Sequence, residues 1–238
     1  MRALGNKKEI KFYQYNDPLN VGDNLGRPLL EHFLPHYKIE QVLESHPNKL
    51  CCIGSVMSKV RDGDVVWGVG SSRPIPISKR ARFLSVRGRL SRALVMGSYV
   101  PEVYGDPGLL FSLMYKPRVK KIPGKVGYVP HYVDKHFFEE QGIDFIDVAL
   151  PWKEFIKEIL KCEHIVSSSL HGIVLAEAYG IPATWVMYSD KIMGGKFKFH
   201  DYLTGTGREV QEPGPFPPIK NLVEIQRKLI KALTDYYD

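Results

Sequence analysis

The sequence contains few cysteines. Three occur among its 238 residues, namely Cys51, Cys52 and Cys162. Three cysteines do not make a disulfide framework, and none of them has the spacing of a zinc site. We therefore expect reduced, buried thiols that act as small apolar groups. A reducing compartment fits this expectation.

Long apolar runs are also absent. No stretch approaches the roughly 20 consecutive apolar residues that a membrane-spanning helix requires. The segment from Met1 to Glu9 is positively charged, but no apolar run follows it. This pattern argues against a secretory signal. Together with the cysteine content, it predicts a cytoplasmic protein.

Several ligand-binding signatures are missing as well. We expect no metal site, because the sequence lacks a His-Glu-x-x-His motif, a paired-aspartate loop and a P-loop lysine motif. The glycine-rich stretch 68–72 lacks the full dinucleotide fingerprint, which argues against NAD or FAD. No nucleic-acid-binding signature accompanies the net charge of +7. The charge therefore favours a phosphorylated substrate or an anionic membrane surface over nucleic acid.

What the sequence does contain is an alternation of short apolar runs and amphipathic stretches. The runs end in Gly or Ser turns, which is typical of α/β layers with largely parallel sheets. Strands are predicted at 10–15, 49–53, 64–67, 82–86, 102–104, 125–129, 145–148, 165–166 and 183–187, and helices at 23–33, 152–161 and 219–236. The cation-rich segment 112–123 resembles a solvated linker. We therefore predict two units, 1–113 and 114–238, with the terminal helix 219–236 packed across both.

The most informative stretch is 165–182, which is predicted to form a strand, a polar turn, a helix and the next strand. The turn is Ser167-Ser168-Ser169, and the helix begins with Leu170-His171-Gly172. Free backbone N–H groups at such a helix start favour a phosphate or a carboxylate. His171 falls in the first turn, close to such an anion. On physical grounds alone, the pattern is equally consistent with serines that only cap the helix and a histidine that packs in an interface.

The segments Ser169-Leu170-His171-Gly172 and 176–182 resemble the hallmark of the polysaccharide pyruvyl transferase family. Further stretches resemble the same family in the same order: 20–25, 67–71, 86–88, 104–110 and 127–132. The resemblance implies a fold similar to the GT-B type, with two Rossmann-like parallel-sheet domains facing a cleft. It also implies transfer of the pyruvyl group of phosphoenolpyruvate onto two sugar hydroxyls, as a ketal, in surface polysaccharide biosynthesis. Phosphoenolpyruvate is then the donor substrate, and no cofactor is required.

The resemblance also suggests roles for individual residues. His171 is expected to act as the general acid or to bind phosphate, because imidazole titrates near neutral pH. Asp23 is expected to act as the base toward the acceptor hydroxyl, although helix capping explains it equally well. Arg87 is assigned to the carboxylate or phosphate of the donor, and His131 is assigned to the donor phosphate or to a proton relay.

Further substrate-binding positions follow from the same motifs: Asn20, Gly70, Ser168, Ser169 and Leu170. Members of the family commonly carry an arginine before the Leu-His pair, where this chain has Ser169. We expect the serine cluster or another cation to compensate. Asp106, in a Gly-Asp-Pro turn, is interpreted as turn chemistry rather than as a catalytic residue.

Two other functions fit the same scaffold. A GT-B glycosyltransferase would use a nucleotide sugar in the same cleft, and a non-catalytic homologue would bind a sugar or phosphate without turnover. For the pyruvyltransferase, the partners are phosphoenolpyruvate and a sugar acceptor. If that acceptor is lipid-linked, the basic surface and the segment 196–203 would hold the enzyme at the inner membrane face.

Overall fold

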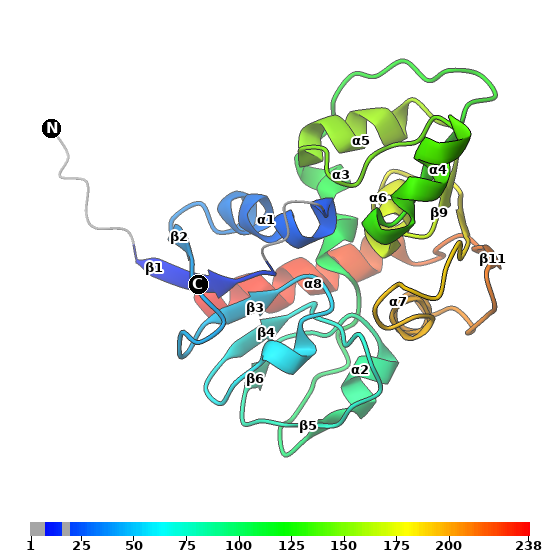
Figure 1. The fold of residues 1–238 in the computed structure, drawn as a ribbon. Coiled ribbons are helices and arrows are strands. Elements are labelled where there is room, and N and C mark those ends of the chain that lie inside the picture. The colour runs from blue at the N-terminus through cyan, green and yellow to red at the C-terminus, as the bar shows by residue number, and fades with distance from the viewer. Residues whose placement is uncertain (1–7, 16–19) are drawn as a thin grey trace, which may run out of the picture.

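The first sheet consists of five short strands, all parallel, in the spatial order β2-β1-β3-β4-β6 (Figure 1). The computed structural model describes residues 8–15 and 20–238, apart from the side chain of Asp23. The strands are β1 (Glu9–Tyr13), β2 (Lys38–Gln41), β3 (Leu50–Cys52), β4 (Val65–Trp67) and β6 (Arg82–Phe83). All residues of β3 and β4 are buried. These central strands are apolar throughout because both faces of the sheet are covered.

The second sheet has the order β11-β10-β9-β8. It contains β8 (Val126–Val129), β9 (His164–Ser167), β10 (Ala183–Trp185) and β11 (Gly214–Pro215). The pairs β8–β9 and β9–β10 are parallel, whereas β11 is antiparallel to β10. Helix α6 (Leu170–Ala178) follows β9, and all nine of its residues are buried. A helix that is apolar all round belongs to the interior, and α6 packs on both the second sheet and the first half of the chain.

The remaining elements surround these sheets. The helices are α1 (Gly26–Phe33), α2 (Arg89–Ala93), α3 (Phe111–Met114), α4 (Lys135–Gln141), α5 (Trp152–Leu160), α7 (Phe197–Gly205) and α8 (Leu222–Tyr237). Short 3₁₀ turns lie at η1 (Val21–Asn24), η2 (Met57–Lys59), η3 (Pro107–Leu110) and η4 (Tyr132–Asp134), and β5 (Ile77–Ser78) pairs with β7 (Val95–Met96). Among the described residues, no helix has both the length and the apolar character needed to cross a bilayer.

One continuous apolar core includes residues of both sheets. Helix α8 contributes Leu229 and Leu233 to it and crosses the middle of the molecule (red in Figure 1). The indole N–H of Trp67, on β4, donates to the carbonyl of Leu229 at 2.9 Å. The Gln226 amide donates to the carbonyl of Leu109 at 2.7 Å. The terminal helix therefore packs against β4 and η3 of the first half, although it follows the second sheet in sequence.

Four predicted elements differ clearly from the structure. The strand expected at 82–86 is shortened to β6, Arg82–Phe83. The helix expected at 23–33 is divided into η1 and α1, because Asn20 caps a separate 3₁₀ turn with its side chain. Residues 145–148 are not a strand, since their one backbone bond to β8 joins the Ile146 N–H to the Tyr128 carbonyl. The strand expected at 102–104 is reduced to a single bridge between Tyr104 and Val86.

Candidate active site

A cavity of about 530 Å³ lies where the strand ends of both sheets meet. Tyr15 and Asn20 reach it from the loop after β1, and Ser55, Ser71 and Arg73 from the loops after β3 and β4. From the second half, its lining comprises His131, Tyr132, Ser169, Leu170, His171, Met193 and Lys198. The carboxyl ends of parallel strands are where open α/β sheets bind ligands. This cavity is therefore the candidate active site.

The start of α6 forms one wall of the cavity. The Ser167 hydroxyl donates to the Val129 carbonyl at 2.8 Å and accepts from the Ser169 N–H at 2.9 Å, which holds the turn closed. A Cβ at Gly172 would lie 2.6 Å from the Ser167 hydroxyl oxygen, so only glycine allows this close packing. The Ser169 side chain makes no cap bond and lines the cavity instead. The positive end of α6 therefore faces the cavity.

Ser168 supports the cavity from behind. It is fully buried, and its hydroxyl donates to Asp134 at 2.7 Å and accepts from the His131 N–H at 2.9 Å. The other carboxylate oxygen of Asp134 accepts from the Ser189 hydroxyl. The structure thus shows Ser168 positioning His131 and places it outside the cavity lining. Its predicted role as a direct ligand stays a prediction.

His131 is a neutral imidazole at physiological pH. Burial, with Lys198 and His171 nearby, lowers its pKa from 6.5 to about 3. Its Nδ1 accepts from the Val133 N–H at 3.4 Å, so the proton resides on Nε2. His131 can therefore donate a hydrogen bond to an anionic ligand without carrying a charge itself.

This lowered pKa predicts a pH-dependent stability. Between pH 6.5 and about 3 the unfolded chain protonates this imidazole, whereas the native protein does not. The unfolded state binds more protons, so the free energy of unfolding should fall as the pH drops through this range, by up to about 1.4 kcal/mol per pH unit. Urea unfolding of the wild type and of His131→Gln at several pH values measures the effect. The variant should lose this part of the slope, and equal slopes would contradict the assignment.

His171 lies opposite a buried carboxylate. It is the second residue of α6, is 6% exposed and lines the cavity. Its Nε2 lies 3.6 Å from Oδ2 of the fully buried Asp106. Both atoms are buried, and neither has a hydrogen-bond partner among the described residues. The other ring nitrogen packs on Gly22, where a Cβ would lie 1.9 Å from it. Asp106 was predicted to be a turn residue, and its Oδ1 does accept from the Gly108 N–H at 2.9 Å.

Arg87 lies behind the cavity wall. It is fully buried, and its guanidinium donates to Asp201 at 3.0 Å, to the Ser55 hydroxyl at 2.7 Å and to the Ser71 carbonyl at 2.7 Å. Ser55 and Ser71 line the cavity, whereas Arg87 does not. A Cβ at Gly70 would lie 2.1 Å from the guanidinium carbon. Only glycine at position 70 leaves room for the Arg87 guanidinium. Arg87 contacts the cavity wall through its hydrogen bonds to Ser55 and Ser71.

The structure also places the remaining predicted residues. Asn20 lines the cavity, and its Oδ1 accepts from the Gly22 N–H at 3.2 Å. Leu170 lines the cavity beside His171. The side chain of Asp23 lies outside the described part of the structure, while its backbone belongs to η1.

Lys198, on α7, is a functional candidate that the sequence motifs did not single out. It lines the cavity, is 8% exposed, and contributes to the lowered pKa of His131. The only sequence signal was a mixture of cations and aromatic residues at 196–203. This buried cation lies in the same cavity as Ser169, the position for which a compensating cation was expected.

The mouth of the cavity is apolar and aromatic. Tyr15, Ile75, Tyr132 and Met193 line it and are between 38% and 67% exposed. The rings of Tyr15 and Tyr132 offer a flat, amphipathic surface to a ligand. Among the described residues, no group of three or more His, Cys, Asp or Glu side chains could hold a metal ion. The cavity thus combines a polar, cationic interior with an apolar mouth.

Comparison with known proteins gives two informative relatives. The chain is 29% identical to "Uncharacterized protein L143" of Acanthamoeba polyphaga mimivirus over 222 residues, covering 85% of this chain and 76% of the relative. It is 27% identical to "Succinoglycan biosynthesis protein ExoV" of Rhizobium meliloti (strain 1021) over 212 residues, covering 82% of this chain. The aligned part is 64% of the Rhizobium protein, so the chain spans less than two thirds of it. No solved structure matches the chain.

The polysaccharide pyruvyl transferase family matches residues 19–190. This range covers well over half of the chain and includes His131, Asp106 and the start of α6. It also includes most residues that line the cavity. The chain belongs to the polysaccharide pyruvyl transferase family.

Proposed function

We propose that this protein transfers the pyruvyl group of phosphoenolpyruvate onto two hydroxyls of a sugar, forming a pyruvate ketal in polysaccharide biosynthesis. The observation that supports this most strongly is the cavity, in which the start of α6, Lys198 and two histidines converge. Family membership supports pyruvyl transfer. In this proposal the two sheets are the halves of a GT-B-like arrangement, and the reaction takes place in the cytoplasm.

The donor carries a phosphate and a carboxylate, and the cavity offers matching groups. The backbone N–H groups that open α6 bind one anionic group, since a helix start favours negative charge. Lys198 supplies a full positive charge, and His131 donates from Nε2. Such charge-assisted hydrogen bonds are stronger than neutral ones. We assign the donor's anionic groups to these three features, with Arg87 holding the wall through Ser55 and Ser71.

The reaction requires a proton at the methylene carbon of the donor. As general acid, His171 would deliver it while one sugar hydroxyl oxygen bonds to the central carbon. The carbon–oxygen bond to phosphate then breaks, and the second hydroxyl oxygen takes its place. Of the two hydroxyl protons, one replaces the proton that His171 gave to the new methyl group, and the other leaves with phosphate. The reaction is therefore balanced without an added oxidant, reductant or cofactor.

Two carboxylates complete this proposal. Asp106 faces Nε2 of His171 and would stabilise the protonated ring, so it is a positioning residue. Asp23 is the proposed base toward the acceptor hydroxyl. It follows Gly22, which packs on His171, and lies three residues after Asn20 of the cavity lining. The aromatic mouth of the cavity would receive the acceptor sugar, because sugar rings pack on aromatic faces.

Calorimetry with phosphoenolpyruvate tests the donor site. Replacing Lys198 by methionine keeps the apolar stem and removes the charge, so the dissociation constant should rise about 10- to 100-fold. Lys196→Met is the matched control, because Lys196 pairs with Glu212 at the surface and is absent from the cavity lining. UDP and GDP serve as comparison ligands. Selective binding of a nucleotide instead of phosphoenolpyruvate would contradict the proposal and favour a glycosyltransferase.

A further inference from the structure

A second hollow, of about 610 Å³, lies away from the candidate active site and shares no lining residue with it. It lies between α5 and the loop 116–125, which joins α3 to β8. In Figure 1 this loop arches over α5. Five of its nine lining residues are cationic and one is acidic: Arg118, Lys120, Lys121, Lys157 and Lys161, with Glu158. The hollow is therefore suited to an anionic partner.

The cations of the loop itself are not paired with carboxylates of the described residues. Lys116, Arg118 and Lys120 are exposed, while Pro117 and Val119 between them are half-buried. In an extended segment such alternation places the cations on one side. Neither these three residues nor Lys121 and Lys125 form an ion pair with any described residue. The segment 112–125 contains no acidic residue.

The loop is anchored rather than loose. The Ile122 N–H donates to the carbonyl of Lys161 at 2.9 Å, and the Glu163 N–H donates to the carbonyl of Lys125 at 2.8 Å. The Gly124 N–H donates to the Glu163 carboxylate at 3.1 Å. These bonds fix the turn 122–125 against the end of α5. The cations are therefore presented on a defined surface.

Exposed aliphatic side chains accompany these cations. Ile122 lies in the hollow, and Leu113 and Val126 flank the loop, with exposures between 42% and 46%. No aromatic residue lines the hollow. Single-stranded nucleic acid is usually bound with aromatic stacking, whereas cations beside exposed aliphatic groups suit the interface of an anionic bilayer. We propose that the 116–125 loop and the adjoining face of α5 bind the surface of a membrane that contains anionic phospholipids.

This surface differs from the segment that the sequence suggested for membrane contact. In the segment 196–203, Lys198, Phe199, Tyr202 and Leu203 are buried within α7. Those side chains face the interior, so they are not available to a bilayer. The proposed membrane surface consists of the 116–125 loop and the adjoining face of α5, and it is independent of the donor chemistry.

Vesicle flotation tests the proposal. The full chain should bind vesicles of phosphatidylcholine with one third phosphatidylglycerol, and not pure phosphatidylcholine. The triple variant Arg118→Gln, Lys120→Gln, Lys121→Gln should weaken binding roughly 100-fold, because each cation near an anionic surface contributes about 5-fold. Ile122→Ser should weaken it by a smaller factor. Raising the salt from 0.1 M to 0.5 M should release the wild type.

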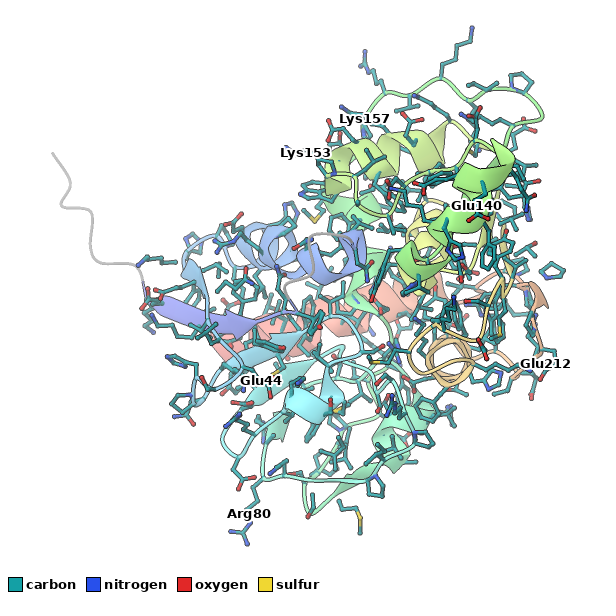
Figure 2. The ribbon with its side chains drawn as sticks, viewed as in Figure 1. Glu44, Arg80, Glu140, Lys153, Lys157 and Glu212 are labelled. Carbon is teal, nitrogen blue, oxygen red and sulfur yellow. The ribbon has the colours of Figure 1, made fainter. Side chains whose placement is uncertain are left out.

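The matched control removes three cations at the other end of the molecule: Lys79→Gln, Arg80→Gln, Arg82→Gln. Arg80 lies far from Lys153 and Lys157 of α5 in Figure 2. This variant should bind vesicles as the wild type does, and both triple variants should keep phosphoenolpyruvate binding. Equal loss in both triple variants would overturn the proposal, because it would indicate net charge alone. So would equal binding to both vesicle types, or binding of a single-stranded RNA 20-mer without vesicle binding.

Discussion

Replacing His171 by glutamine should lower kcat for pyruvyl transfer by about 10²- to 10⁴-fold, the usual contribution of a general acid. Glutamine keeps a hydrogen-bonding group in the cavity but cannot deliver the proton. The dissociation constant for phosphoenolpyruvate should therefore change only a few-fold. Phosphate release with galactosyl and mannosaminyl acceptors measures kcat, and calorimetry measures donor binding.

His164→Gln is the matched control for this experiment. His164 lies on β9, and its ring bonds the Thr184 hydroxyl at 2.8 Å, outside the cavity lining. This variant should keep full activity. If His171→Gln retained wild-type kcat, another residue would have to protonate the methylene carbon.

Asp106→Asn separates positioning from binding in the same mechanism. The amide keeps an oxygen for the Gly108 N–H, but it cannot stabilise a protonated His171 as a carboxylate does. We expect kcat to fall while the dissociation constant for phosphoenolpyruvate stays unchanged. Asp62→Asn is the control, because Asp62 also accepts from a backbone N–H, that of Arg80, at 2.9 Å. A purely structural Asp106 would lower the stability without this separation of kcat from binding.

Replacing Asp201 by alanine should destabilise the protein by about 3–5 kcal/mol, the usual effect of leaving a buried charge without its partner. Asp201 and Arg87 are both fully buried. Asp201 also accepts from the Ser91 N–H at 2.7 Å and from the Ser91 hydroxyl at 2.6 Å. Urea unfolding should show the loss as a lower midpoint.

Two comparisons make this stability prediction specific. Arg87→Met combined with Asp201→Leu should recover most of the loss, since an apolar pair replaces the buried ion pair. Glu212→Ala, which breaks the surface pair with Lys196, should cost no more than about 1 kcal/mol. A loss of similar size for Asp201→Ala and Glu212→Ala would contradict the importance of the buried pair.

Local patterns predicted much of the α/β layering. The strands at β3, β4, β8 and β9 lie within a residue or two of their predicted bounds, because apolar runs closed by Gly or Ser turns are a local signal. Strand β2 was missed, since its sequence Lys38-Ile39-Glu40-Gln41 carries one apolar residue. It pairs at the sheet edge with β1, where cross-strand charges such as Lys38 and Glu9 are tolerated.

In the candidate site too, local sequence patterns identified some residues, whereas contacts between residues distant in sequence determine the positions of others. His171 and Ser169 were found from the residues that open α6, and the structure places both in the cavity. The assignment of Arg87 to the donor stays a prediction. The sequence could not show that Asp201, on α7, pairs with Arg87 behind the cavity wall. Asp106 looked like a turn residue because its nearest neighbours explain it. Its approach to His171 joins positions 65 residues apart, which no local pattern reveals.

The packing of α8 has a consequence for the order of folding. Trp67 buries its indole against Leu229, and the Tyr37 hydroxyl donates to the carbonyl of Tyr237. Domains at the start of a chain generally fold first during synthesis, but here the first sheet cannot cover Trp67 until α8 has left the ribosome. The apolar face around Trp67 therefore stays exposed on the nascent chain while the second sheet is synthesised. A chain truncated before α8 should accordingly be captured by chaperones rather than released as a stable half.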